Sequence, residues 1–181
     1  MRSNTAAAAA KKPRPRSVAS VSKPSSMVHL VPKDGEEPKD HFIDVNGVRA
    51  AGRHLIIELW TNEGLADRDC LEKAFIDGAD LAKATLLHIH LHTFGGGGGI
   101  TGVVALAESH MSVHTWPENG YGAFDAFMCG KANPHKLVDV LREALKPIGM
   151  IVYEILRGTG GKMIIINETR EGVIPAQQHQ T

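Results

Sequence analysis

Several features are scarce in this chain, and each scarcity argues against a class of protein. Among 181 residues there are two cysteines, Cys70 and Cys129, which favours reduced thiols in the cytoplasm over a disulfide framework. No apolar run approaches the roughly 18 residues of a membrane-spanning helix, and we expect no membrane partner. The formal net charge is zero, so no overall attraction to nucleic acid or anionic lipid is expected.

The composition is that of an ordinary globular protein, with 43% hydrophobic and 22% charged residues. We expect one domain over residues 41–170 and a flexible C-terminal tail over 171–181. Residues 1–40 hold an alanine run and a basic cluster but no apolar periodicity, which predicts a disordered tail. A targeting peptide is the alternative, because residues 1–27 contain Arg and Lys but no acidic residue. A nucleic-acid-binding arm is a further alternative.

The hydrophobic pattern alternates between strand and helix signals. Apolar residues at helical spacing predict one helix over 67–83, and Asn133 followed by Pro134 predicts the N-cap and first residue of another. The expected strands are 54–61, 86–94, 100–107, 111–116, 122–129, 151–156 and 163–166. Short links between consecutive strands predict an α/β fold of the α+β type, a two-layer sandwich in which helices cover a largely antiparallel sheet.

Two features before the central motif suggest sites that we do not favour. His88, His90 and His92 alternate on one strand face, but neighbouring positions about 6.5–7 Å apart suit three ligands of one metal ion poorly. We expect no metal and interpret them as pocket or surface residues. The five glycines at 95–99 lack the Gly-Lys-Ser/Thr of a phosphate loop, so a flexible hinge is expected instead.

Residues 108–130 gather a hydroxyl, imidazoles, a carboxylate and a thiol more densely than a structural strand pair would. The segment contains Glu-Ser-His, His-Thr-Trp-Pro-Glu, Gly-Tyr-Gly-Ala-Phe-Asp-Ala-Phe and Cys-Gly in that order. In these motifs it resembles the bacterial S-adenosylmethionine decarboxylase proenzymes, and the resemblance extends from about residue 52 to about 162. It implies the same two-layer fold, built as a homodimer of processed two-chain protomers.

The resemblance also implies that the cofactor is made from the chain itself. Cleavage between Glu108 and Ser109 would convert Ser109 into a covalent pyruvoyl group. His114 matches the base of this processing, and Thr101 stands where the family has an assisting serine. Threonine keeps the hydroxyl, so we expect that role to survive.

Further positions match residues that act on the substrate, S-adenosylmethionine. Cys129 matches the proton donor of the decarboxylation. Glu118 matches a carboxylate that binds the ribose hydroxyls, and Phe94 resembles a ring that stacks on adenine. The glycines at 95–99 replace bulkier residues of the family, which leaves contacts from that loop open.

A pyruvoyl group is chemically reasonable, because decarboxylation of an amino acid requires an electron sink. No lysine stands in a setting typical of pyridoxal phosphate, whereas a serine can become a ketone. The predicted function is therefore decarboxylation of S-adenosylmethionine for spermidine biosynthesis. The alternative is a pyruvoyl-dependent decarboxylase of a free basic amino acid, ornithine or arginine. A non-enzymatic binding protein would be expected to lose Ser109 or Cys129, and both are present.

Overall fold

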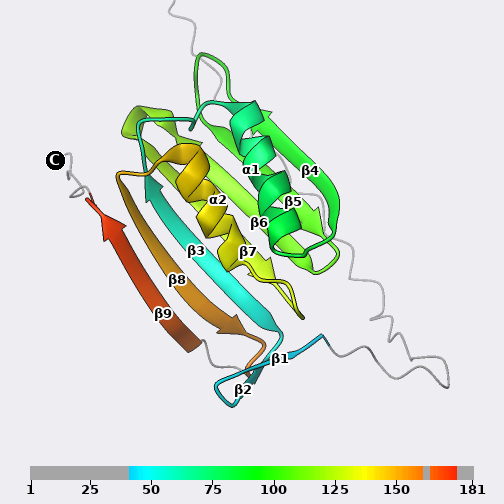
Figure 1. Cartoon of the computed structure of the whole chain (residues 1–181). Helices are drawn as coiled ribbons and strands as arrows, with labels where there is room; N and C mark the ends of the chain where they lie inside the picture. The colour runs from blue at the N-terminus through cyan, green and yellow to red at the C-terminus, as the bar shows by residue number, and fades with distance from the viewer. Residues whose placement is uncertain (1–40, 161–163, 175–181) are drawn as a thin grey trace, which may run out of the picture. The chain divides into compact units, whose positions relative to one another are not determined.

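The computed structural model describes residues 41–160 and 164–174, and in them a seven-stranded antiparallel sheet carries two helices on one face (Figure 1). The strand order is β4-β5-β6-β7-β3-β8-β9. The strands are β3 (Gly52–Trp60), β4 (Leu86–Thr93), β5 (Ile100–Leu106), β6 (Ser109–Trp116), β7 (Tyr121–Met128), β8 (Gly149–Arg157) and β9 (Ile164–Gly172). The predicted two-layer sandwich is confirmed. The predicted tail at 1–40 lies outside the described residues.

The helices α1 (Arg68–Leu81) and α2 (His135–Leu145) cover the sheet through the apolar stripes that the sequence predicts. Phe75 of α1 and Leu141 of α2 are fully buried against strand residues such as Phe124. The side chain of Asp67 caps α1 by accepting hydrogen bonds from the amides of residues 69 and 70. Neither described helix is long and apolar enough to cross a membrane.

The start of α2 differs from the prediction by one position. The helix begins at His135, and Pro134 occupies the cap position with helical backbone angles. The Asn133 side chain still accepts a hydrogen bond from the His135 amide at 3.1 Å. Asn133 therefore satisfies an amide that the first turn leaves unpaired, as an N-cap does.

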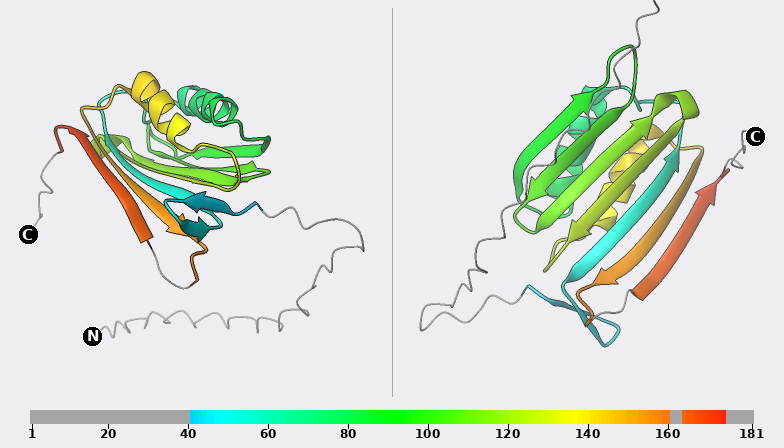
Figure 2. Two further views of the ribbon diagram at one scale, coloured as in Figure 1. Left: turned by 60° about the horizontal axis from the view of Figure 1, so that its bottom comes forward. Right: turned by 180° about the vertical axis from the view of Figure 1, so that it is seen from behind.

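The opposite face of the sheet carries no described helix (Figure 2, right). Along each strand, alternate residues point to this open face. On β6 these are His110, Ser112, His114 and Trp116, whereas Met111, Val113 and Thr115 are buried toward the helices. Six histidines lie at open-face positions of β3, β4 and β6: His54, His88, His90, His92, His110 and His114.

Two elements depart from the sequence prediction. A hairpin of β1 (Ile43–Val45) and β2 (Val48–Ala50) precedes the sheet and was not predicted. Its turn is Asn46-Gly47, with φ of 50° and 80°, which is a strong hairpin signal in sequence. The last strand was predicted over 163–166 but β9 continues to Gly172, because a polar strand can lie at a sheet edge.

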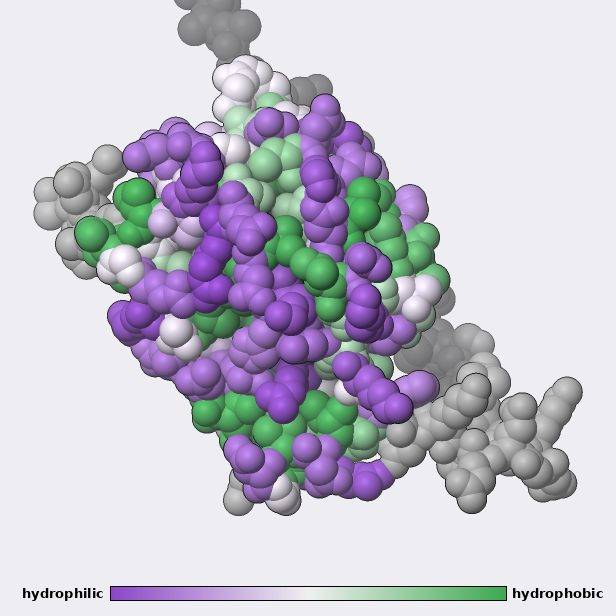
Figure 3. Space-filling view, viewed as in Figure 1, coloured by the Kyte–Doolittle hydropathy of each residue, from purple (hydrophilic) through white to green (hydrophobic). Residues whose placement is uncertain are grey.

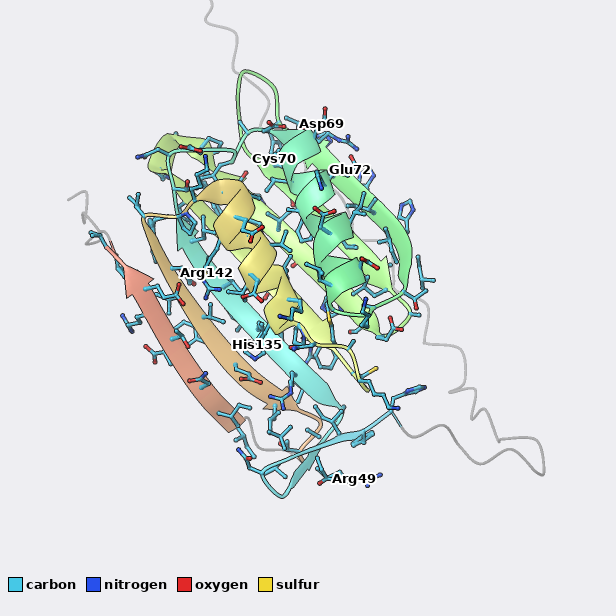
Figure 4. All side chains as sticks on the ribbon, viewed as in Figure 1. Arg49, Asp69, Cys70, Glu72, His135 and Arg142 are labelled. Carbon is cyan, nitrogen blue, oxygen red and sulfur yellow. The ribbon has the colours of Figure 1, made fainter. Side chains whose placement is uncertain are left out.

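Polar contacts fasten β8 and β9 to α2. Arg142 of α2 donates to both carboxylate oxygens of Glu171 on β9, at 2.8 and 2.6 Å. The carboxylate of Glu154 is buried on β8 and pairs with Arg53 of β3 and with His135 at 3.2 Å. Figure 4 labels Arg142 and His135 on α2.

Hydrophilic residues cover much of the helix side, and hydrophobic ones gather near β1 and β2 (Figure 3).

The glycine loop before β5 is partly structural rather than only a hinge. Gly96 and Gly97 have φ of 76° and 77° and nothing near an added Cβ. At Gly99, an added Cβ would lie 1.8 Å from the backbone oxygen of Thr115. Glycine is therefore required where the loop enters β5 beside β6.

Substituting Gly99 should accordingly cost stability where substituting Gly95 does not. We expect Gly99→Ala to lower the free energy of unfolding by about 1–3 kcal/mol, because backbone must move to admit the methyl group. Gly95→Ala meets no atom within 4 Å and should change it by less than about 1 kcal/mol. Urea unfolding of both variants measures the difference, and equal midpoints would contradict the assignment.

Candidate active site

The turn between β5 and β6 is held on one side by Thr85, which precedes β4. Ala107 donates its amide to the Thr85 carbonyl at 2.9 Å. The Glu108 carboxylate accepts from the Thr85 amide at 2.7 Å and from its hydroxyl at 3.1 Å. The backbone hydrogen bond from Thr85 lowers the pKa of Glu108 and outweighs the opposing effect of burial. An ionised Glu108 therefore anchors this turn at neutral pH.

The carbonyl oxygen of Glu108 is held from the other side by Cys129. It accepts a hydrogen bond from the Cys129 amide at 3.1 Å and a second from the Cys129 thiol at 2.9 Å. Two donors that converge on one carbonyl oxygen stabilise the negative charge that develops there when a nucleophile attacks the carbon. This carbonyl belongs to the peptide bond at which the sequence predicts cleavage.

Ser109, on the other side of that peptide bond, has an unusual backbone and a close polar neighbour. Its φ is 152°, a positive value that non-glycine residues seldom adopt. Its Oγ lies 3.1 Å from Nδ1 of His110. Ser109 pairs with Leu106 of β5 and Met128 of β7, so strands on both sides hold this conformation.

The remaining predicted residues gather at the other end of the same strands. His114 of β6 pairs with Thr101 of β5, and its ring lies 6.1 Å from that of Phe94 and 4.2 Å from that of Trp116. Glu118 is exposed in the short 3-10 helix Pro117–Asn119 that follows. We call His114, Thr101, Phe94 and Glu118 the distal group, and Glu108, Ser109 and Cys129 the turn group.

The two groups do not meet within one chain. Ser109 and His114 are five residues apart on an extended strand, which corresponds to about 16 Å at 3.2–3.4 Å per residue. Within one protomer, the residues of the turn group lie near one another, and so do those of the distal group, but His114 does not reach Ser109.

Aromatic rings extend the distal group across the open face. Tyr121 of β7 stacks with Trp116 at 5.3 Å between ring centroids and lies 5.5 Å from Trp60 of β3. Its hydroxyl donates to Glu58 at 2.8 Å, and burial together with this contact raises its pKa strongly. Together with half-exposed Phe94, these rings offer a platform for a planar aromatic ligand.

Three contacts at the turn were not predicted from the sequence. His110 follows Ser109 directly in the chain, so its proximity to the hydroxyl could have been noticed. The contact of Thr85 with Glu108 and the thiol contact of Cys129 with the Glu108 carbonyl carry no sequence signal, because they depend on strand register.

No set of three or more metal-ligating side chains is close enough to hold an ion within residues 41–160 and 164–174. A groove of about 540 Å³ lies between α1 and α2 on the helix side. It is lined by residues that include Cys70 and Asp77 and by none of the predicted site residues. Neither observation adds a ligand site to the turn or distal groups.

Comparison with known proteins places these observations in a family. Residues 53–158 match the family model described as S-adenosylmethionine decarboxylase. A protein of Methanococcus maripaludis named S-adenosylmethionine decarboxylase proenzyme is 39% identical over 127 residues, which span 68% of this chain and 100% of that protein. One of the same name from Thermomicrobium roseum is 38% identical over 112 residues, 61% of this chain and 97% of that protein.

A solved structure agrees with the sequence matches. The crystal structure of the adenosylmethionine decarboxylase from Aquifex aeolicus superimposes with a TM-score of 0.52 at 25% identity. The match covers 72% of this chain and 98% of that one.

The positive φ of Ser109 predicts a difference in stability that can be measured without an activity assay. Ser109→Gly and Ser109→Ala both remove the hydroxyl, but only glycine adopts a φ of 152° without a Cβ penalty. We therefore expect Ser109→Gly to be at least as stable as Ser109→Ala in urea unfolding.

Ser112 on the same strand is the control for this comparison. It has no positive φ, so Ser112→Gly should be about 0.5–1 kcal/mol less stable than Ser112→Ala. The same penalty at Ser109 would show that its backbone is unstrained.

Proposed function

The chain belongs to the S-adenosylmethionine decarboxylase family, and from this membership we propose how its residues make the cofactor and hold the substrate. Its activity is the decarboxylation of S-adenosylmethionine, which provides the aminopropyl donor for spermidine biosynthesis. We propose that the chain is a proenzyme that cleaves itself between Glu108 and Ser109. The observation that carries this proposal is the pair of Cys129 donors on the Glu108 carbonyl oxygen, next to the Ser109 hydroxyl.

Self-cleavage uses groups that the turn already presents. Ser109 Oγ attacks the Glu108 carbonyl carbon, the Cys129 amide and thiol hold the oxyanion, and the amide becomes an ester. Removal of the Ser109 α-proton then breaks the ester bond, which releases Glu108 with a main-chain carboxylate and leaves dehydroalanine at position 109. Water converts this residue to a pyruvoyl group and releases ammonia. By resemblance, His114 removes the α-proton and the Thr101 hydroxyl assists.

The residues around Ser109 fit a pyruvoyl group, because Ser109 would begin the new chain and the Cys129 thiol is hydrogen-bonded to the carbonyl of the residue before it. When formed, this group supplies the electron sink for the bond that loses carbon dioxide. Cys129 delivers the proton to the substrate α-carbon. Glu118 binds the ribose hydroxyls and Phe94 stacks on adenine, beside the rings of His114 and Trp116.

A complete site requires a second copy of the chain. The turn group and the distal group lie at opposite ends of β6, on either side of the row of open-face residues that contains Ser112. A two-fold axis near that row would place His114 of a second copy beside Ser109 of the first. Apolar side chains such as Val103, 58% exposed on this face, would then be covered. We propose a homodimer with two composite sites.

Self-cleavage and composition of the site can be tested together by mass spectrometry. The wild type should separate into residues 1–108 and 109–181, and Ser109→Ala and His114→Ala should each remain uncut. Co-expression of these two variants should cut about half of the His114→Ala chains, since random pairing gives half of them a partner with His114.

In the control, the co-expressed partner chain also lacks His114. Co-expression of His114→Ala with a chain carrying both Ser109→Ala and His114→Ala should leave every chain uncut. A wild type that turns over substrate as one intact chain would refute self-processing. Absence of cutting in the mixed dimers would refute the composite site alone.

The substrate contacts generate a separate prediction. A carboxylate that binds a ribose diol contributes about 1.5–3 kcal/mol, and stacking contributes about 0.5–1.5 kcal/mol. Glu118→Gln should thus lower kcat/KM for S-adenosylmethionine about 10- to 150-fold, and Phe94→Ala about 2- to 13-fold. Both variants should still self-cleave.

Glu72→Gln is the control for Glu118→Gln, because Glu72 lies on α1 and pairs with Arg68. It should leave kcat/KM unchanged. Ornithine and arginine should remain unreacted by the wild type, since no comparison supports a free amino acid as substrate. Efficient turnover of either, with none of S-adenosylmethionine, would reverse the assignment.

A further inference from the structure

His110 is the one described side chain within hydrogen-bond distance of the Ser109 hydroxyl, at 3.1 Å from Oγ to Nδ1. The first step of self-cleavage needs a base at this oxygen, because a neutral hydroxyl is a weak nucleophile. A general base must lie within about 2.6–3.2 Å of the oxygen from which it takes the proton. His110 meets this condition in a single protomer, whereas His114 lies about 16 Å along the strand.

We propose that His110 takes the Ser109 hydroxyl proton in the first step of self-cleavage and returns it to the departing nitrogen. This inference rests on the proposed self-processing and adds a catalytic residue to it. The two histidines then divide the process: His110 serves ester formation within its own chain, and His114 of the second copy serves the later elimination.

The proton that leaves the Ser109 hydroxyl in this step is returned to the chain. The Oγ–H proton moves to Nδ1 of His110 as Oγ bonds to the Glu108 carbonyl carbon, with the oxyanion held by the Cys129 donors. The oxyanion collapses, the bond from this carbon to the Ser109 nitrogen breaks, and His110 protonates that nitrogen. His110 ends neutral, nothing is oxidised or reduced, and no co-reactant is consumed.

The surroundings of His110 favour the neutral imidazole that a base requires. Burial lowers its pKa, and the neighbouring His54 and Arg157 lower it further, against an opposite effect of Asp125. Its ring lies 5.8 Å from that of Phe127. The titratable or charged groups that act on the ring are His54 of β3, Asp125 of β7 and Arg157 of β8. His88 of β4 lies in the same row but is separated from His110 by Ala105 of β5.

The test separates ester formation from elimination with hydroxylamine, which cuts an ester at Glu108 but not the amide there. The fragments 1–108 and 109–181 are followed, because hydroxylamine also cuts Asn-Gly bonds such as Asn46-Gly47 and Asn119-Gly120. In His114→Ala, the ester should accumulate and hydroxylamine should cut the chain. In the double variant His110→Asn/His114→Ala, hydroxylamine-dependent cutting should be at least 100-fold slower, as expected for loss of a general base. Asparagine can accept the Ser109 hydrogen bond but cannot take the proton, so positioning alone would preserve the rate.

The pH profile distinguishes a base from a structural residue. In His114→Ala, ester formation should slow as pH falls through the pKa of His110, since the protonated ring cannot accept a proton. The double variant should lack this decline. Should asparagine disturb folding, His110→Ala/His114→Ala offers a second measurement, in which added imidazole should restore ester formation.

His88→Asn/His114→Ala is the matched control, because His88 lies two strands away in the same row and does not contact Ser109. It should form the ester at the rate of His114→Ala. Unchanged rate and pH profile on loss of His110, with wild type still cleaving, would overturn this inference alone. A wild type that never cleaves would instead refute the proposed function.

Discussion

The two hydrogen bonds from Cys129 to the Glu108 carbonyl oxygen are the constraint on which the site depends. They fasten the end of β7 to the peptide bond that precedes β6, while Thr85 fastens the same turn to the start of β4. With both flanks held, Ser109 can keep a φ of 152° that an isolated turn would relax. The same donors that organise the ground state are placed where the charge of the tetrahedral intermediate would develop.

The period of a β-strand explains why Ser109 and His114 lie apart in one protomer. Residues of β6 progress by about 3.3 Å and alternate between faces, so Ser109 and His114 cannot converge on one substrate. In the proposed homodimer, a second copy would present its distal group to the uncovered sheet face. Three polar side chains on the face are already paired: Asp125 contacts His54 at 3.3 Å and Ser112 at 3.0 Å, and its pKa is lowered chiefly by His54. Covering such paired groups costs less than covering free ones.

Most of the fold followed from local patterns. The stripes of α1 and α2 and the alternating strands β3 to β8 were predicted because their hydrophobic period survives in the folded core. The β1–β2 hairpin was missed although Asn46-Gly47 announces it, and β9 was predicted too short because an edge strand carries little apolar signal. The glycines at 95–99 were interpreted as a hinge, but Gly99 is required by the close approach of Thr115, which only the pairing of distant segments creates.

The sequence by itself determined the identity of the reactive groups, the helices that cover the sheet and, through its motifs, the family. Tertiary structure decided which of those groups meet. Glu108 and Cys129 are distant in sequence yet hydrogen-bonded, because the antiparallel register that pairs Ser109 with Met128 folds β7 back to the turn. Ser109 and His114 are close in sequence yet separated, because an extended strand holds its residues apart. Sequence spacing measures distance along the chain, and strand pairing converts it into distance in space.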